Sequence, residues 1–132
     1  QSFYPFSGLQ EGRWLRVAGV RSTRSDQLPL CWSEVLVPEG LAPTLDAVKQ
    51  GDRAIYEIIM HEQGLKLDYV EQEVSAATMP SAMADLLHAN SETAALAVKR
   101  RYVANNGQTF ELSYNLYPAT RYSVRSVIRQ RI

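Results

Sequence analysis

Apolar and polar residues alternate along four segments of this chain, which fall into two pairs. The first pair is 14–23 and 28–37, and the second pair is 95–104 and 108–116. Such alternation is typical of β-strands, whose successive side chains point to opposite faces. A few polar residues separate the members of each pair, and Asn-Gly in the second pair is the strongest short signal for a hairpin turn. The pattern therefore predicts two β-hairpins.

The two hairpins resemble one another in sequence. Residues 15–38 align with residues 95–118 without a gap at an offset of 80 (101 − 21 = 80), and the polar turns coincide. Four positions are identical, where chance gives roughly one or two: Arg21 and Arg101, Ser33 and Ser113, Leu36 and Leu116, and Pro38 and Pro118. This layout predicts one sheet with pseudo-two-fold organisation. A polar cleft between like halves is a natural place for a small ligand.

The segment between the hairpins carries helical patterns. Apolar residues at helical spacing, followed by Gly64 at a C′ position, predict a helix at 53–62. Shorter helices are expected at 41–48 and 81–87. Residues 65–77 alternate with a drift in phase, which predicts a long strand with a bulge.

A final strand, rich in arginine, is expected at 123–132. With hairpins dominating the order of elements, the sequence predicts an α+β fold: a mainly antiparallel sheet with helices packed on one side.

Candidate chemistry lies on the strand at 108–116, whose side chains should separate into two faces. One face is apolar and predicts the core: Phe110, Leu112, Tyr114 and Leu116. The other is rich in hydrogen-bonding groups: Thr109, Glu111, Ser113, Asn115 and Tyr117. This polar face is either a solvated outer surface or the floor of a pocket. Arg21 and Arg101 are either surface ion-pair partners or charged groups that clamp an anion at that pocket.

Composition narrows the class of protein. The 132 residues suit one domain, and 14 basic residues balance 14 acidic ones, which argues against a segment that grips nucleic acid. The single Cys31 cannot form an internal disulfide, which favours a reducing cytoplasm. No stretch resembles a membrane span or a signal peptide. His61 and His88 belong to no ligand-spaced cluster, so we expect no metal and no cofactor.

The run from Ala54 to Arg131 resembles a known family. Its landmarks are AIYEIIMHEQGLKL at 54–67 and TMPSAMADLLHANSETAALAVKRRYVANNGQTFELSYNLYPATRY at 78–122. These segments are similar to the UTRA domain, the effector-binding half of GntR-type bacterial transcription regulators of the HutC branch. The first hairpin fits the opening strand pair of that family.

This resemblance implies a chorismate-lyase-like α+β fold that binds a small metabolite, signals to an N-terminal winged helix-turn-helix domain, and forms homodimers. We expect residues 1–12 to be an arm or linker and residues 13–132 to be the UTRA effector-binding domain. The DNA-binding domain is absent from this chain, which starts at Gln1 as a fragment would.

Site residues follow from the resemblance position by position. The Arg-x-Arg of sugar-phosphate-binding members falls on Arg21 and Thr23, so only the first arginine matches. Their Ser-x-Tyr falls on Ala54 and Tyr56, which loses the serine. Their glutamate and the tyrosine six residues later match Glu111 and Tyr117. Because two phosphate-contacting positions are changed, the resemblance favours a carboxylate, amino-acid-like or sugar-derived effector.

Three hypotheses remain open. The first is an effector-sensing domain of a repressor, in which Arg21 holds an anion and Glu111 accepts from a hydroxyl or amine. Its other contacts would come from Thr23, Tyr56, Arg101, Ser113 and Tyr117. The second is a chorismate-lyase-like enzyme on the same fold. The third is a dimerisation module without a ligand.

Overall fold

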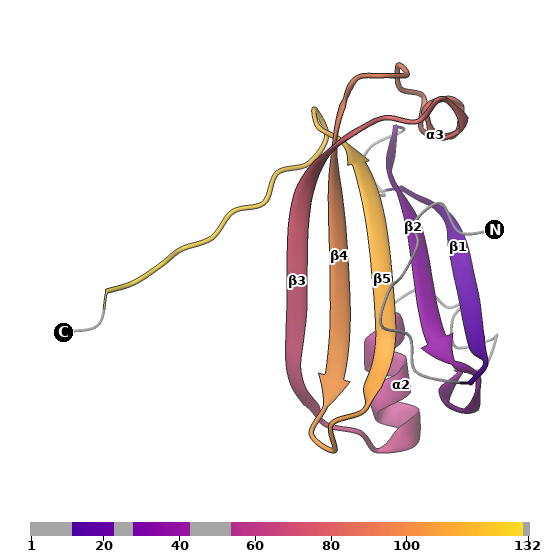
Figure 1. The fold of residues 1–132 in the computed structure, drawn as a ribbon, viewed down its shortest axis with the longest axis vertical. Coiled ribbons are helices and arrows are strands. Elements are labelled where there is room, and N and C mark those ends of the chain that lie inside the picture. The colour runs from indigo at the N-terminus through magenta and orange to yellow at the C-terminus, as the bar shows by residue number, and fades with distance from the viewer. Residues whose placement is uncertain (1–11, 23–27, 43–53, 131–132) are drawn as a thin grey trace.

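The computed structural model describes residues 12–22, 28–42 and 54–130, which build a five-stranded antiparallel sheet (Figure 1). The strands are β1 (Trp14–Ser22), β2 (Pro29–Pro38), β3 (Leu67–Thr78), β4 (Ala94–Ala104) and β5 (Thr109–Pro118). Their order is β1-β2-β5-β4-β3, so β5 is the central strand. The expected α+β class with a mainly antiparallel sheet is confirmed.

The register of the central strands agrees with an internal repeat. β2 and β5 are each the second strand of a hairpin and lie side by side. Glu34 pairs with Tyr114, and these are positions that the offset of 80 equates (114 − 34 = 80). A bulge also interrupts both hairpins at equivalent positions, since the pairing skips Leu30 in the first and Phe110 in the second (110 − 30 = 80). The predicted pseudo-two-fold organisation is present.

The first strands of the two hairpins do not follow this offset. Arg21 pairs with Cys31, but Glu111, the equivalent of Cys31, pairs with Tyr102 and not with Arg101. A shift of one residue turns a side chain to the opposite face of a sheet. The prediction that Arg21 and Arg101 occupy matching places is therefore wrong.

The bulge in β5 also corrects the predicted faces of that strand. Phe110 turns towards Tyr102, with ring centroids 6.3 Å apart, instead of joining Leu112. Thr109 turns to the other face, where its Oγ1 accepts a hydrogen bond of 3.3 Å from Arg101 Nη1. A bulge adds an unpaired residue and reverses the alternation beyond it. From Glu111 to Leu116 the predicted alternation holds.

Helix α2 (Ile55–Gln63) covers one face of the sheet and lies behind it in Figure 1. It follows a 3-10 turn, η1 (Glu39–Leu41), along the chain. Its start is fixed by Glu57, whose Oε1 accepts from the Ala54 N–H at 3.3 Å. It ends at Gly64, which has a left-handed φ of 64°, as the sequence predicts. Ile59 is fully buried in a cluster with Val37 and Tyr102.

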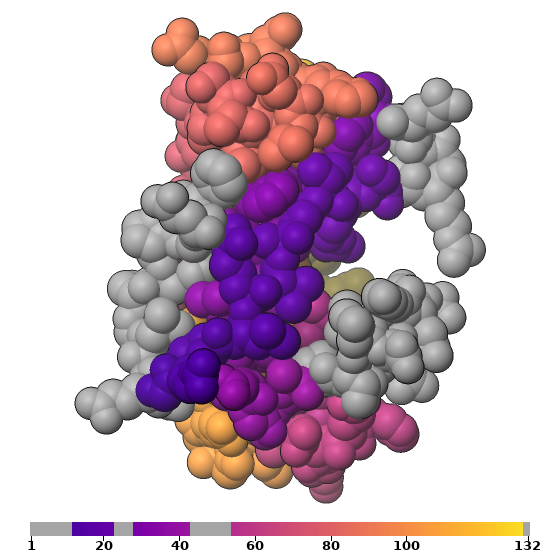
Figure 2. Space-filling view, turned by 90° about the vertical axis from the view of Figure 1, so that its right-hand side faces the viewer, coloured from indigo at the N-terminus to yellow at the C-terminus, as the bar shows by residue number. Residues whose placement is uncertain are grey.

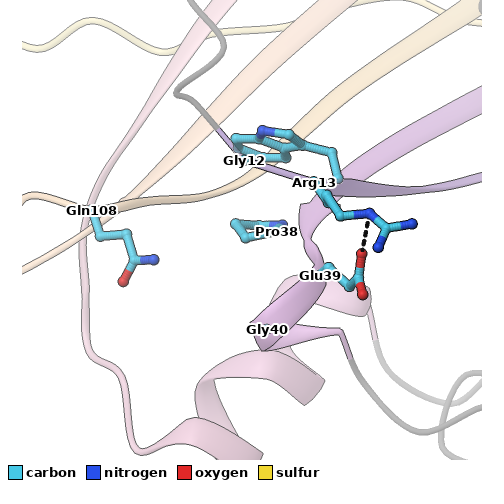
Figure 3. A pocket seen from close by; sticks show the side chains of 7 residues that line it. Gly12, Arg13, Pro38, Glu39, Gly40 and Gln108 are labelled. Atoms are coloured by element: carbon cyan, nitrogen blue, oxygen red, sulfur yellow. Dashed lines mark ion pairs between the residues drawn. The ribbon is translucent and has the colours of Figure 1, made fainter.

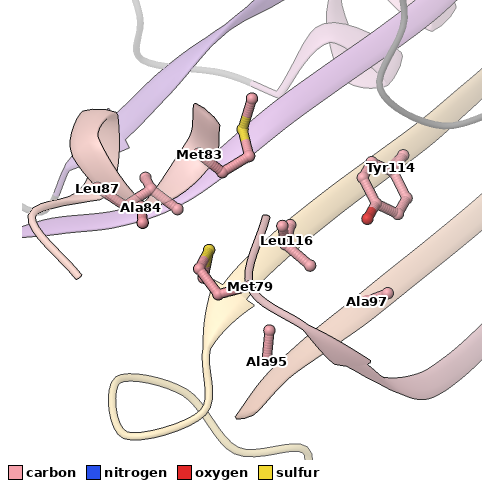
Figure 4. Packing of buried hydrophobic residues seen from close by; sticks show 8 residues of the cluster. All are labelled: Met79, Met83, Ala84, Leu87, Ala95, Ala97, Tyr114 and Leu116. Atoms are coloured by element: carbon pink, nitrogen blue, oxygen red, sulfur yellow. The ribbon is translucent and has the colours of Figure 1, made fainter. Parts of the chain in front are cut away.

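Helix α3 (Ser81–Leu87) packs on the opposite face of the sheet (Figure 4). Its Met83 belongs to a buried cluster that also contains Met79, Ala95 and Ala97, and the two alanines alternate with the β4 residues that face α2. Figure 2 shows α3 at one end of the molecule and α2 towards the other, with β1 between them. The expectation that the helices share one side is wrong for the two described helices, because short links tie α3 to β3 and β4, and the small alanines there leave room for methionine.

Several sequence predictions concern the ends of elements. The bulge expected in β3 is confirmed and falls at Asp68. The prediction of a strand at 123–132 is wrong for residues 123–130, which form an exposed arm that leaves the sheet (Figure 1). Residues 131 and 132 lie outside the described residues. The helix expected at 41–48 falls mostly outside the described residues, as does the arm expected at 1–12. No helix in the described segments has the length and apolar character needed to cross a membrane.

The packing of α3 predicts a contrast between two adjacent leucines. Leu87 is fully buried, whereas Leu86 is 47% exposed. We expect Leu87→Ala to lower the free energy of unfolding by about 2–5 kcal/mol and Leu86→Ala by under about 1 kcal/mol. Urea unfolding of both variants measures the difference, and equal losses would contradict the placement of α3.

Candidate functional site

A row of polar side chains forms the floor of a cavity. Glu111, Ser113 and Asn115 occupy alternate positions of β5 and point to the face that α2 covers. Their exposed fractions are only 3%, 4% and 4%. Alternate residues of a strand are about 7 Å apart, so the row offers three contact points along one line. The polar face predicted from the sequence is therefore buried and is not a solvated outer surface.

Each of these three residues has a buried oxygen that lacks a hydrogen-bond partner among the described residues. The atoms are Glu111 Oε1, Ser113 Oγ and Asn115 Oδ1. A buried polar atom without a partner costs about 1–3 kcal/mol, and native proteins contain few of them. Three in one row, all facing the same cavity, point to a ligand that supplies the missing partners.

The cavity has a volume of about 420 Å³, which suits a small metabolite. Four of the five strands and the start of α2 contribute to it. β1 and β2 supply Arg21, Ser33 and Val35; the start of α2 supplies Ala54, Ile55 and Tyr56; and β4 supplies Arg100 and Tyr102. The cavity therefore lies between the two hairpins, as the sequence repeat predicts.

Two aromatic rings join α2 to the sheet beside the cavity. Tyr56 stacks on Tyr102 with ring centroids 4.7 Å apart and an interplanar angle of 23°. Because Tyr56 lies in the first turn of α2, this stack fixes the position of that turn over the floor. Burial raises the pKa of the Tyr102 phenol, and so does the charge that Glu111 carries once it ionises at higher pH, so this hydroxyl stays protonated and can donate.

The charge state of the floor is set by Glu111. Burial raises the pKa of its carboxyl to about 8, although the nearby positive charge of Arg100 acts in the opposite direction. At neutral pH this carboxyl is largely protonated, so it can donate one hydrogen bond and accept another. Arg100 is held in place by its Nε, which donates to Gln72 Oε1 at 2.7 Å. The site therefore combines arginine charge at its wall with a largely uncharged polar floor.

Four of the seven predicted site residues line this cavity. They are Arg21, Tyr56, Glu111 and Ser113. Thr23 lies outside the described residues. Their role in binding an effector stays a prediction, but the structure brings these four side chains to one place.

The other two predicted residues lie elsewhere. Arg101 is on the opposite face of the sheet and forms an ion pair of 3.2 Å with the exposed Glu71, the alternative that the sequence left open. Tyr117 packs with Cys31 and stacks on Tyr122, with centroids 3.8 Å apart. Burial raises the pKa of Cys31 to about 11 and raises that of Tyr117 as well, so both groups are neutral and act as core residues.

Arg100 and Tyr102 are the main cavity residues that the sequence reasoning missed. They lie opposite Ser113 and Glu111 in the register of β4 and β5. Alternation along β4 separates them from Arg101, but only the register shows which of the two faces meets the polar floor. The sequence placed Asn115 on the polar face that could form a pocket floor but not among the predicted contacts, and it marked Ser33 only as a repeat identity.

A second hollow lies at the end of β1 and is lined by Arg13, Pro38, Glu39 and Gln108 (Figure 3). Its charged groups already pair with one another, since Arg13 Nε is 3.2 Å from Glu39 Oε2. The side chains of this pair are 87% and 60% exposed, so the contact is a weak surface ion pair. No buried unpartnered atom of the described chain faces it, and we assign no site there. Among the described residues no three His, Cys, Asp or Glu side chains are grouped to hold a metal ion.

Comparison with known proteins gives the family context of this geometry. The family model of the UTRA domain matches residues 16–123. Among solved structures, a GntR-family transcriptional regulator from Enterococcus faecalis V583 is similar, with a TM-score of 0.77 and 21% identity over 87% of this chain and 81% of that chain. No protein of curated function matches the sequence.

PhnF from Mycobacterium smegmatis is similar in two structures. Its effector domain gives a TM-score of 0.76 and 18% identity over 89% of this chain and 70% of that chain. A further PhnF structure gives a TM-score of 0.70 and 13% identity over 90% of this chain, which covers only 61% of that PhnF chain. At these identities the likeness shows the fold, and the expected chorismate-lyase-like α+β fold is confirmed.

The raised pKa of Glu111 predicts how stability depends on pH. The carboxyl holds its proton up to about pH 8 in the folded chain but loses it near pH 4.5 when unfolded. The folded state therefore binds more protons in this interval, and stability falls as the pH rises through it. We expect urea unfolding to show a steeper loss of stability between about pH 5 and about pH 8 for the unsubstituted chain than for Glu111→Gln. Equal pH dependence of the two chains would contradict a buried, protonated Glu111.

Proposed function

Because this chain belongs to the UTRA domain family, we propose that it is the effector-sensing domain of a bacterial transcription regulator of the GntR family and HutC branch. The observation that carries this proposal is the row of three buried oxygens, which lack partners in the described chain and face one cavity. A solvated sheet face or a purely structural dimerisation module has no need of such a row, because unpaired buried oxygens reduce stability unless a ligand satisfies them.

The chemistry of the cavity indicates the class of effector. Asn115 Oδ1 can only accept, and Ser113 Oγ can accept, so the effector must present hydroxyl or amine donors to the floor. Arg21 and Arg100 at the wall favour an anionic group at the other end of the molecule. Ala54 brings no hydroxyl to the start of α2, which weakens a phosphate site. We therefore propose a hydroxy- or amino-carboxylic acid, with amino-acid-like compounds and sugar acids as its two sources.

Binding would act on the relative positions of three elements. An effector that contacts Arg21, Tyr56 and Arg100 together would hold the first hairpin, α2 and the second hairpin in one arrangement. A ligand shifts an equilibrium only by its difference in affinity for the two states, so an arrangement that closes all three elements on the effector is the favoured one. In the proposed full-length repressor, a cytoplasmic homodimer, this change would reach DNA through a separate N-terminal winged helix-turn-helix domain.

A thermal-shift screen against carboxylates, amino acids, sugar acids and sugar phosphates tests the proposal. A ligand at about 100 times its dissociation constant should add about 2.7 kcal/mol of stability. We expect a hydroxy- or amino-carboxylate to give the shift and Glu111→Ala to abolish it. If every class leaves the melting temperature unchanged, a sensor of these metabolites is excluded.

Two adjacent arginines provide a matched pair for the same screen. Arg100 lines the cavity, whereas Arg101 lies on the opposite face and pairs with Glu71. We expect Arg100→Ala to weaken effector affinity by about tenfold or more, in the range of about 1.5–3 kcal/mol for a charge-assisted hydrogen bond. Arg101→Ala should leave the dissociation constant unchanged. A loss of affinity in Arg101→Ala alone would place the effector on the opposite face of the sheet and would contradict the proposed site.

A further inference from the structure

Two arginines of the sheet have no acidic partner in the described chain, and both line the effector cavity. On the opposite face of the sheet, each cationic side chain of a described strand pairs with a glutamate, in the pairs Arg16–Glu34, Lys99–Glu73 and Arg101–Glu71. Arg21 and Arg100 lie on the cavity face, and no described carboxylate forms an ion pair with either of them. The unbalanced positive charge of the described strands is therefore gathered at one cavity.

The acidic side chain that lines this cavity does not offset these charges. Among the described lining residues only Glu111 has a carboxyl group, and burial raises its pKa to about 8. At neutral pH this group is largely uncharged, so Arg21 and Arg100 leave the described lining with two positive charges. Arginine forms its strongest hydrogen bonds with anionic oxygens. A ligand with two negative charges therefore matches this lining better than a ligand with one.

The two arginines approach the floor from opposite sides of the cavity. Their strands, β1 and β4, are three strand spacings apart, about 14 Å (Figure 1). Arg21 pairs with Cys31, which packs with Tyr117. Tyr117 pairs with Leu96, and Arg100 lies four residues further along β4 (100 − 96 = 4), about 13 Å away. The backbones of the two arginines are therefore about 19 Å apart across the sheet.

This separation favours one anion at each arginine over a single anion held by both. The Nε of Arg100 donates to Gln72 Oε1 at 2.7 Å. Because Gln72 is on β3, this hydrogen bond directs the guanidinium away from β1 and leaves its Nη groups for a ligand. Both arginines still act on the floor strand: burial raises the pKa of Tyr117, while the positive charges of Arg21 and Arg100 both act to lower it. Each arginine therefore offers its own anion contact at one side of a shared cavity.

The floor between the arginines suits hydroxyl groups. Glu111, Ser113 and Asn115 each have a buried oxygen without a described partner, and they follow one another at intervals of about 7 Å. A hydroxyl both donates and accepts, so it can satisfy Asn115 Oδ1 and can also accept the proton of Glu111. An ammonium group would bring a third positive charge beside the two arginines. The floor therefore favours several hydroxyls over an amine.

We propose that the effector is a polyhydroxy dicarboxylate, a carbon chain with a carboxylate at each end and hydroxyl groups between them. One carboxylate binds Arg21, the other binds Arg100, and the hydroxyls face the polar floor of β5. This inference rests on the proposed function and narrows its hydroxy- or amino-carboxylic acids to one class, the sugar diacids.

A matched series of ligands tests the inference by calorimetric titration of the unsubstituted chain. Glucarate and galactarate carry a carboxylate at each end. Gluconate has the same number of carbons but only one carboxylate, and adipate has both carboxylates but no hydroxyl. We expect glucarate or galactarate to bind at least about tenfold more tightly than gluconate and adipate, the effect of losing a charge-assisted hydrogen bond. Equal or tighter binding of gluconate or adipate would overturn the inference.

Removal of either arginine should abolish the preference for the diacid. In Arg21→Ala and in Arg100→Ala one carboxylate of glucarate loses its partner, whereas gluconate can place its single carboxylate at the arginine that remains. We therefore expect each variant to bind glucarate and gluconate with nearly equal affinity. Arg101→Ala, on the opposite face, is the matched control and should keep the full preference. If both ligands lose affinity by the same factor in each cavity variant, one carboxylate contacts both arginines and the inference is wrong.

Two further ligands separate failure of this inference from failure of the proposed function. Glucose 6-phosphate carries its charge on a single group, and glutamate is a dicarboxylate with an amine in place of hydroxyls. If either binds more tightly than both sugar diacids, the polyhydroxy dicarboxylate is overturned but a sensor of small metabolites remains. If no ligand of the series binds and no class in the thermal-shift screen raises the melting temperature, the proposed function fails as well.

Discussion

The burial of β5 on both faces is the constraint on which the rest of the structure depends. All ten residues of this central strand are buried, because β2 and β4 flank it, α2 contributes to the cover of one face, and the α3 cluster packs against the other. Leu112, Tyr114 and Leu116 point to the face on which α3 packs, where burial of their side chains stabilises the fold. Glu111, Ser113 and Asn115 occupy the opposite face, where desolvation opposes folding by about 1–3 kcal/mol for each unpaired group. The surrounding apolar clusters must offset this cost, and the strand therefore holds polar atoms ready for a ligand.

In this arrangement a ligand in the cavity would contact several elements of the fold at once. Its wall draws on the first hairpin, the second hairpin and the first turn of α2, so no single element holds a ligand alone. The Tyr56–Tyr102 stack couples α2 to β4, and Gln72 of β3 holds Arg100 at the wall.

Much of the fold could be predicted from local sequence signals. Asn106-Gly107, the alternation of β5 and Gly64 after α2 act through near neighbours, and each marked the element that the structure contains. The buried polar row was visible for the same reason. The predictions that were wrong depend on the register between distant strands. A shift of one residue in β4 places Arg100, and not Arg101, at the cavity. A bulge at Phe110 turns Thr109 to the opposite face of the sheet. The side on which α3 packs depends on links and on small alanines across the sheet. Residues 123–130 carry a strand-like pattern but pair with no described strand, because a pattern along the chain does not specify a neighbour.

The cavity floor is built of buried polar groups, and the protonation of Glu111 reports on this burial directly. Carbon-13 NMR of the side-chain carboxyl, assigned by comparison with Glu111→Gln, gives the pKa of this group without unfolding the chain. The account predicts a titration midpoint of about 8 in the ligand-free protein. A midpoint near the ordinary value of 4.5 would show that the carboxyl is exposed to water and would contradict a buried polar floor.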